Sequence, residues 1–184
     1  MSKIHEQVEI DAPAERVWAV VAEDVKNAPR WTTYLDKAEK LDDGPPAPLP
    51  IGKAALRRAG HHLAIISYGA YVHTALSVAD RLEADGIEAA VLDLRTIAPL
   101  DKTAVLAVAR HCGRVLVVHE DTRTGGIGES VAAVVQEEAF EWLDAPVRVI
   151  GALDTPVPYS PPLEDAFLPG EGEIEKAARL LLAY

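Results

Sequence analysis

The stretch LAIISYG at residues 63–69 decides the fold, because a near-continuous apolar run from Leu63 to Tyr68 ends there at a glycine. Such a run is typical of a strand that is buried on both faces of a parallel sheet. The next residues place apolar side chains three and four positions apart, which predicts a helix that stops at Asp85-Gly86; these side chains are Val72, Ala75, Leu76, Ala79 and Leu82. A second apolar run, Ala89 to Leu94, then completes a strand–helix–strand unit.

The same alternation continues to the end of the chain. In order, the sequence predicts a helix from Pro99-Leu100-Asp101 through Val108, a strand at 114–118, a helix at 126–141, a strand at 146–150, a proline-rich loop at 156–169 and a closing helix at 173–182. Apolar strands that alternate with helices indicate a sheet covered on both sides. We therefore expect an α/β fold with three αβα layers and a mostly parallel sheet.

The first part of the chain has a different pattern. Residues 42–50, DDGPPAPLP, contain four prolines, which fix an extended backbone and predict a linker. Before it, alternating residues from Ile4 to Ile10 predict a short strand, and Asp11 is a candidate N-cap for the first of two short helices. We expect a β-α-α segment at 1–41, the linker at 42–50 and the main domain at 51–184. So short a segment can bury little surface by itself.

Charge and composition exclude some classes of function. The formal net charge of −11 argues against nucleic-acid binding, because contact with phosphates requires a surplus of Lys and Arg. A single cysteine, Cys112, cannot form an intramolecular disulfide, which favours an intracellular setting. The first residues lack the apolar run of a signal peptide, and no stretch reaches the roughly 20 apolar residues of a membrane span. We expect a cytoplasmic protein with no membrane partner.

The run HEDTRTGGIGES at 119–130 is the main candidate for chemistry, because it follows the third strand, where doubly wound sheets bind ligands. Gly126-Ile127-Gly128 lacks the third glycine of a dinucleotide fingerprint, and no Gly-Lys-Ser/Thr triplet of a P-loop occurs. Tight turning and close helix packing explain the glycines better. Neighbouring residues of an extended chain, such as His119 and Glu120, point to opposite faces and rarely bind one metal ion.

Other candidate groups are also better explained as structural. No Cys-x-x-Cys or His-Glu-x-x-His spacing occurs. Ser67 and Ser130 lack the Gly-x-Ser-x-Gly of a nucleophile elbow, and Cys112 has no evident base beside it. The aromatic residues Trp18 and Trp31, with Tyr34, are open to two interpretations, a small core or the lining of an apolar ligand cavity.

From Pro50 onward the sequence resembles the C-terminal domain of the beta subunits of 2-oxo acid dehydrogenases, within the transketolase C-terminal group. The motifs that carry this resemblance are PIGKA at 50–54, ISYGAYVHTAL at 66–76, LDLRTIAPLD at 92–101, GRVLVVHEDTRTGGIG at 113–128 and EEAFEWLDAPVRVIGALDTPVPYSPPLEDAFLP at 137–169. The beta subunits of pyruvate and branched-chain dehydrogenases are the most similar in style. The resemblance implies that this domain alone binds no thiamine diphosphate, since that cofactor lies between other domains of the family.

Residues 1–48 resemble the opening strand and helices of the START-like polyketide cyclase superfamily (SRPBCC), through VEIDAPAERVWAVVAEDVKNAPRWTTYLDKAEKL. They stand where the dehydrogenase family has its pyrimidine domain, which carries a cofactor-activating glutamate and an active-site histidine. The resemblance therefore transfers no catalytic residue to this chain, which looks like a chimera of two truncated units.

The dehydrogenase resemblance implies a role in assembly. It places Asp144 and the terminal carboxylate of Tyr184 on the surface that docks the basic peripheral subunit-binding domain of the acyltransferase core. His119 and Glu120 are expected to face a neighbouring alpha or beta subunit in a homo- or hetero-oligomer. Two alternatives remain: part of a thiamine diphosphate-dependent dehydrogenase completed by other subunits, or an SRPBCC-type protein that binds an apolar ligand. Asp144 could equally be a solvated turn residue before Pro146.

Overall fold

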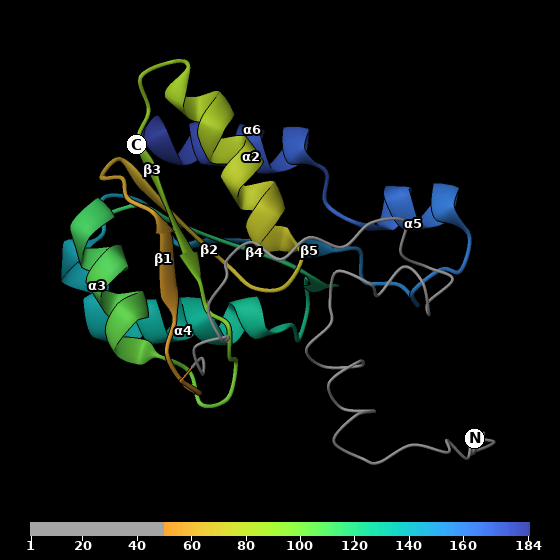
Figure 1. Cartoon of the computed structure of the whole chain (residues 1–184), viewed down its shortest axis with the longest axis horizontal. Coiled ribbons are helices and arrows are strands. Elements are labelled where there is room, and N and C mark those ends of the chain that lie inside the picture. Colours follow the sequence, from red (N-terminus) through yellow and green to blue (C-terminus); the bar gives the residue numbers. More distant parts are fainter. Residues whose placement is uncertain (1–49) are drawn as a thin grey trace, which may run out of the picture. The chain divides into compact units, whose positions relative to one another are not determined.

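The computed structural model describes residues 50–184, which form a five-stranded sheet with helices on both faces (Figure 1). The strands are β1 (Ala55–Arg58), β2 (Leu63–Ser67), β3 (Ala89–Asp93), β4 (Val115–Thr122) and β5 (Arg148–Ala152). The helices are α2 (Tyr71–Glu83), α3 (Lys102–Cys112), α4 (Ile127–Ala139), the 3-10 turn η3 (Phe140–Trp142), α5 (Pro161–Phe167) and α6 (Glu171–Leu182).

The strands follow the order β1-β3-β2-β4-β5, and each pairing from β3 to β5 is parallel. Ile65 of β2 lies opposite both Val91 of β3 and Leu116 of β4, so apolar residues stack across the centre of the sheet. Only β1 is antiparallel, to β3. The expected α/β fold with a mostly parallel sheet is confirmed.

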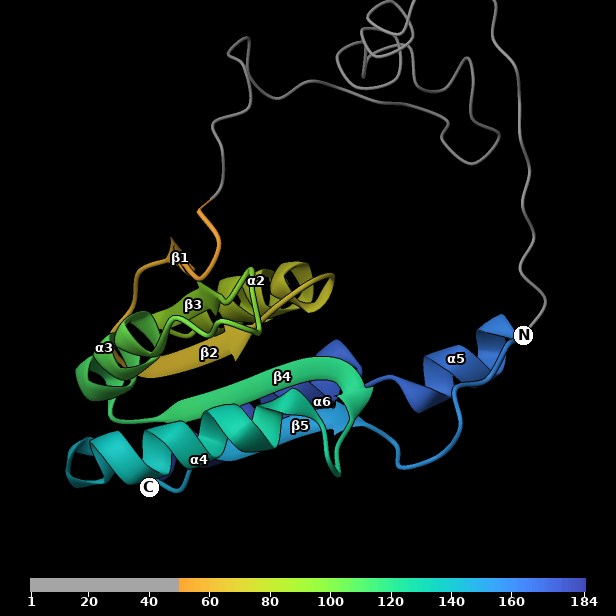
Figure 2. The same ribbon diagram turned by 90° about the horizontal axis from the view of Figure 1, so that it is seen from below.

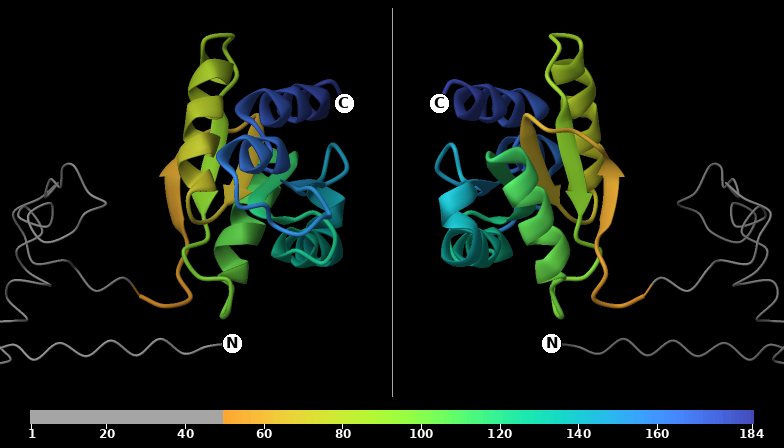
Figure 3. Two further views of the ribbon diagram at one scale, coloured as in Figure 1. Left: turned by 90° about the vertical axis from the view of Figure 1, so that its right-hand side faces the viewer. Right: turned by 90° about the vertical axis from the view of Figure 1, so that its left-hand side faces the viewer.

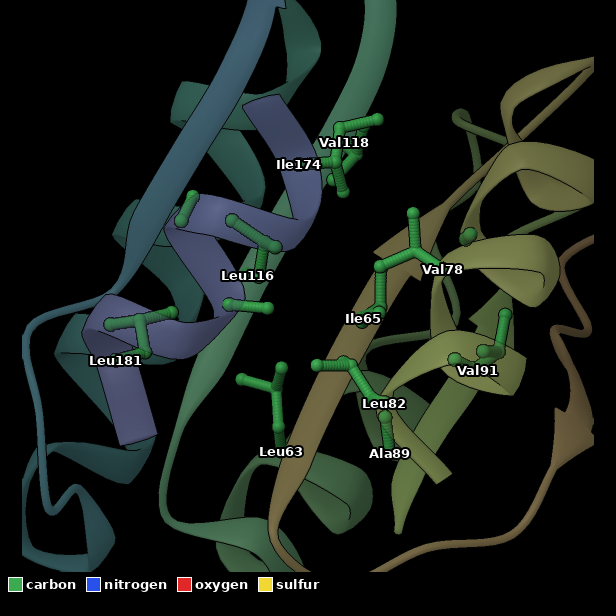
Figure 4. Close-up of a cluster of buried hydrophobic side chains, with 14 of the residues drawn as sticks. Leu63, Ile65, Val78, Leu82, Ala89, Val91, Leu116, Val118, Ile174 and Leu181 are labelled. Carbon is green, nitrogen blue, oxygen red and sulfur yellow. The ribbon is translucent and has the colours of Figure 1, made fainter. Parts of the chain in front are cut away.

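Two apolar cores lie on the two faces of the sheet, which confirms the three layers. Successive residues of β2 alternate between them: Leu63 and Ile65 pack in the core under α2 and α6, and Ala64 and Ile66 pack in the core over α3 and α4. Figure 3 shows these two helix pairs on opposite sides of the strands. Figure 4 shows the first core, where side chains from β2 and β4 meet those of α2 and α6. Burial of both faces explains why the first four residues of β2, β3 and β4 are all apolar.

Local signals in the sequence set the ends of α3. The side chain of Asp101 accepts a hydrogen bond from the N–H of Ala104 at 3.2 Å, so this aspartate caps the start of the helix. Gly113 follows the helix with φ 67°, a left-handed conformation that glycine adopts without strain. The chain then turns directly into β4.

The structure differs from the sequence-based expectation in three places. β1 was not expected, and α5 lies in the segment 156–169 that was expected to be a loop. β4 continues to Thr122, four residues beyond its expected end at Val118. The expected segment at 1–41 lies outside the described residues, and the proposed domain boundary stays a prediction. Within residues 50–184, no helix is long and apolar enough to cross a membrane.

Candidate functional site

The carboxyl ends of the parallel strands point toward α5, while the C-terminus of the chain lies at the opposite end of β4 (Figure 2). His119, Glu120 and Asp121 belong to this end of the sheet. They were expected to follow β4, but they lie inside it, because the strand extends to Thr122. Their side chains therefore alternate between the two faces of a strand and do not share one loop.

His119 is the central residue of this end, and it is fully buried with 0% of its surface exposed. Three glycines surround its imidazole: a Cβ on Gly126 or Gly151 would lie 2.7 or 2.8 Å from Cε1, and one on Gly128 would lie 2.6 Å from Cδ2. Real Cβ atoms do not approach other atoms so closely. The ring of Tyr68 stacks nearby, with 6.2 Å between ring centroids. These glycines form a cage for His119.

The hydrogen bonding of His119 fixes which ring nitrogen carries the proton in its neutral form. Its Nδ1 lies 3.1 Å from the carbonyl oxygen of Asp121, which can only accept, so Nδ1 carries the proton. Nε2 is buried without a hydrogen-bond partner among residues 50–184. Burial lowers the pKa of His119, and the bond to Asp121 opposes that effect only in part. The expectation that His119 faces a neighbouring subunit is corrected by this burial, because the imidazole has no exposed surface with which to contact one.

The glycine loop between β4 and α4, residues 123–126, is held by hydrogen bonds to carboxylates of the same chain. Asp154 accepts hydrogen bonds from the N–H of Thr124 at 2.8 Å and from its hydroxyl at 2.7 Å. Glu129 accepts from the N–H of Gly125 at 3.1 Å and from the guanidinium of Arg123 at 2.7 Å. An incoming phosphate would need these N–H groups and would meet negative charge. The residues present here do not fit the diphosphate of a cofactor.

The remaining candidate groups are engaged in structure. The hydroxyl of Ser67 donates to the carbonyl of Val118 at 2.9 Å and joins β2 to β4. Cys112 is buried, and burial raises the pKa of its thiol to about 11, so it is no nucleophile near neutral pH. No cluster of three potential metal ligands occurs in the part of the chain that the structure describes. This end of the sheet offers packing and hydrogen bonding, without an assembled acid–base pair.

Glu120 is exposed at the same end of the sheet, where its charge affects the pKa of two tyrosines. Burial raises the pKa of Tyr71 to about 12, with a further contribution from Glu120, and the Tyr71 hydroxyl donates to the carbonyl of Pro169 at 2.9 Å. The pKa of Tyr68 is raised by burial and by the charges of Asp121 and Glu120. The charge of Glu120 thus helps to keep the hydroxyls of Tyr68 and Tyr71 protonated.

The opposite end of the sheet holds the other two candidates. Asp144 accepts from Nη1 of Arg114 at 3.1 Å, and Nε of the same arginine donates to the carbonyl of Leu181 at 3.2 Å. Arg114 therefore ties the Asp144 turn to the last turn of α6, three residues before the exposed side chain of Tyr184. The N–H of Asp144 also donates to the carbonyl of Gly113 at 2.7 Å, which fixes the turn.

The four candidates consequently form two groups. Asp144 contacts Arg114 at the start of β4, and the same arginine binds the carbonyl of Leu181 near the chain end, whereas His119 and Glu120 lie at the far end of the strand. Five residues of strand separate Arg114 from His119, roughly 16 Å. The two groups therefore lie at opposite ends of β4 and do not form one site.

Sequence reasoning missed the residues that hold the glycine loop, Asp154 and Glu129. Glu129 carried a detectable signal, because it lies in the first turn of a predicted helix, where a carboxylate meets free N–H groups. Asp154 carried none, since 30 residues separate it from the Thr124 that it binds.

Comparison with known proteins agrees with this architecture. The family described as "Transketolase, C-terminal domain" matches residues 52–174, which include every strand and the first turn of α6. The chain belongs to the transketolase C-terminal domain family. A second family, "Polyketide cyclase / dehydrase and lipid transport", matches residues 1–83. The two matches overlap at 52–83, and there the structure has β1, β2 and α2 of the α/β domain.

Among curated relatives of this transketolase C-terminal domain, the 2-oxoisovalerate dehydrogenase subunit beta of Bacillus subtilis is 45% identical over 137 residues. The pyruvate dehydrogenase E1 component subunit beta of the same organism is 41% identical over 136 residues. Each alignment covers 74% of this chain and 42% of the relative. The chain therefore spans less than half the length of these curated relatives.

Solved structures show the same fold. A split-gene transketolase, described as an inactive beta4 tetramer, is 26% identical with a TM-score of 0.66, over 80% of this chain and 47% of that one. A transketolase of Pichia stipitis is 18% identical with a TM-score of 0.51, over 72% of this chain and 18% of that one, and it supports the fold alone.

Proposed function

We propose that this chain is a non-catalytic assembly module of the kind found in beta subunits of thiamine-dependent 2-oxo acid dehydrogenases. It binds other dehydrogenase subunits and the basic peripheral subunit-binding domain of the acyltransferase core. The main support is the exposed pair of Asp144 and Tyr184 beside Arg114, together with the dehydrogenase beta subunits among the relatives.

The charge of this surface suits a basic partner. The Asp144 side chain is 59% exposed although it contacts Arg114, so one face of its carboxylate remains available to a second cation. A carboxylate has more lone pairs than one arginine uses. The negative charge of the whole chain also favours encounter with a basic domain.

Two features of the described residues support a non-catalytic role. The loop N–H groups of Thr124 and Gly125 are bound by Asp154 and Glu129, and the buried His119 has no exposed nitrogen with which to move a substrate proton. The domain alone should therefore bind no thiamine diphosphate. An active enzyme would need other subunits to supply the cofactor site.

A binding measurement with matched variants tests the docking surface. The full chain is titrated with an acyltransferase peripheral subunit-binding domain in a calorimeter, and Asp144→Lys is compared with Glu137→Lys. Both variants change the charge equally, but Glu137 lies on α4, in an exposed position without an ion-pair partner among residues 50–184. We expect Asp144→Lys to weaken binding at least tenfold, about 1.4 kcal/mol. An unchanged Kd for Asp144→Lys would contradict the docking surface.

Two further measurements test the class of function. Co-purification from the native host should recover dehydrogenase subunits with this chain. Thiamine-dependent decarboxylation of a 2-oxo acid by the isolated chain would refute a non-catalytic role. The apolar-ligand alternative rests on Trp18, Trp31 and Tyr34, which lie outside the described residues. Residues 52–83, the part of that family match that is described, already belong to the α/β sheet.

A further inference from the structure

Trp142 is an exposed tryptophan two residues before the candidate docking residue Asp144. It is the last residue of the turn η3, and 53% of its surface is exposed. Tryptophan side chains in a purely structural role are largely buried. At binding surfaces they are enriched, because the indole combines a large apolar face with a polar N–H group. The exposure of Trp142 therefore points to a contact with a partner.

The backbone at Leu143 directs the side chains of Trp142 and Asp144 to the same side. Leu143 has the extended conformation φ −90°, ψ 128°, and its side chain packs against the core over α3 and α4. The side chains that flank an extended residue point away from the side chain of that residue. Trp142 and Asp144 therefore both face outward, with their Cα atoms about 7 Å apart.

The carboxylate of Asp144 is held in one position and is still accessible. The N–H of Asp144 donates to the carbonyl of Gly113 at 2.7 Å, and its carboxylate accepts from Arg114 at 3.1 Å. A Cβ on Gly113 would lie 2.5 Å from Oδ2 of Asp144, so this glycine leaves the space that the carboxylate fills. The Asp144 side chain is nevertheless 59% exposed. A carboxylate that is already fixed loses little conformational freedom when a partner binds it.

The groove that follows Asp144 along the chain is less suited to a cation than the surface of Trp142. Pro146 and Tyr184 line this groove, which has a volume of about 420 Å³. Arg148 lines it as well and is exposed, so a second cation there would meet a like charge. A cationic group that binds Asp144 is therefore favoured on the side of Trp142.

We propose that an arginine of the basic partner stacks on the indole of Trp142 while it donates hydrogen bonds to the exposed side of the Asp144 carboxylate. The guanidinium is planar, so its face stacks on an aromatic ring while its N–H groups, which lie in its plane, reach a carboxylate. A lysine ammonium is a compact, strongly hydrated charge without a face to stack. This contact rests on the proposed function, because it names the anchor of the same docking surface.

Trp142 and Asp144 contribute to different steps of binding. The exposed charge of Asp144 attracts a basic partner from a distance, so it affects mainly the association rate and the dependence of that rate on salt. The uncharged indole of Trp142 acts only after contact, when it stacks and excludes water, so it affects mainly the dissociation rate. Measured rates therefore distinguish the two residues better than an affinity does.

Surface plasmon resonance with the full chain and an acyltransferase peripheral subunit-binding domain measures both rates. We expect Trp142→Ala to speed dissociation at least tenfold, while the association rate and its salt dependence stay close to those of the native chain. Tyr159→Ala is the matched control, because Tyr159 is a fully exposed aromatic residue in the loop before α5, at the carboxyl end of the sheet. The control should leave both rates unchanged.

Two milder variants test the stacked cation, even if Trp142→Ala fails to fold. Trp142→Tyr keeps an aromatic face and should dissociate about threefold or more slowly than Trp142→Leu, which keeps only apolar volume. Equal dissociation rates for these two variants overturn the stacking. A native chain that binds the domain, with Trp142→Ala as tight as Tyr159→Ala, overturns the anchor and leaves the docking surface of Asp144 standing. A native chain that binds no such domain overturns the proposed function and the anchor together.

Discussion

The close packing of glycines around His119 predicts that Gly128→Ala destabilises the fold. Gly128 is the second residue of α4 and is buried. A Cβ at this position would lie 2.6 Å from Cδ2 of His119 and 2.7 Å from Cγ1 of Val149. Both distances are below the 3.0 Å that real Cβ atoms respect, so the imidazole or the helix must move.

The imidazole has little room to give way. Its Nδ1 is bonded to the carbonyl of Asp121, and a Cβ on Gly126 or on Gly151 would already be too close to Cε1. Forcing extra atoms into a packed site costs about 1–3 kcal/mol. Alanine is favoured over glycine inside a helix by up to ~1 kcal/mol, and this gain is smaller in the first turn. We therefore expect Gly128→Ala to lower the free energy of unfolding by about 1–2 kcal/mol net.

Gly172→Ala is the matched control. Gly172 is also the second residue of its helix, α6, and a Cβ there meets no atom within 4 Å. Urea unfolding followed by circular dichroism should show no loss of stability for Gly172→Ala and a clear loss for Gly128→Ala. In thermal scans each kcal/mol should appear as a shift of about 2–4 °C for a chain of this size.

A double-mutant cycle identifies the group that resists the new methyl. His119→Ala removes the ring, so Gly128→Ala should cost less in that background than in the native chain, apart from the remaining contact with Val149. Strictly additive costs would show that His119 does not limit the site. If Gly128→Ala behaves like Gly172→Ala, the packing argument for the glycine is refuted.

Three further predictions concern single side chains. Asp101→Ala should lower the free energy of unfolding by about 1–2 kcal/mol in urea titrations, because Asp101 caps α3 through Ala104 and also accepts from the N–H of Ala54 at 3.1 Å; an effect below 0.3 kcal/mol, roughly the error of such titrations, would contradict the cap. Cys112 should react with a thiol reagent only upon unfolding, since it is 97% buried (3% exposed) and its pKa is raised to about 11; rapid labelling of the native chain would contradict its burial. The pKa of His119 in the folded chain lies below 6.5, so the unfolded chain binds more protons and the free energy of unfolding should fall as the pH drops below about 6.5. His119→Gln should flatten this dependence of the unfolding free energy on pH. An unchanged dependence would exclude His119 as its source.

The central strands could be predicted from sequence because both of their faces are buried, which leaves an unbroken apolar run such as that of β3. β1 gives no such signal, because ALRR at Ala55–Arg58 is half exposed at an edge and its pairing with β3 is irregular. The short α5 begins with two prolines, so the same residues that predict a loop also suit the first turn of a helix. Edges and short helices depend on tertiary contacts that a sequence pattern does not reveal.

The site was less predictable than the fold. The glycines depart from the known phosphate-binding motifs, and this departure correctly predicted that they serve packing. The sequence did not reveal which group they pack against. Gly126, Gly128 and Gly151 come from two separate segments and converge on His119 only in the folded domain. The polar run His119-Glu120-Asp121 looked like a loop, whereas the strand continues through it with His119 on a buried face.

The arrangement of charged groups at the end of β4 supports the proposed role in assembly. At the carboxyl end of β4 the carboxylates of Asp154 and Glu129 bind the loop of their own chain, so the N–H groups of Thr124 and Gly125 are satisfied internally. Arg148 and Lys176, which have no ion pair among residues 50–184, lie elsewhere, in a groove beside β5. The exposed carboxylate of Asp144, at the other end of β4, needs no enclosed pocket to attract a basic partner, because charge complementarity acts across an open surface.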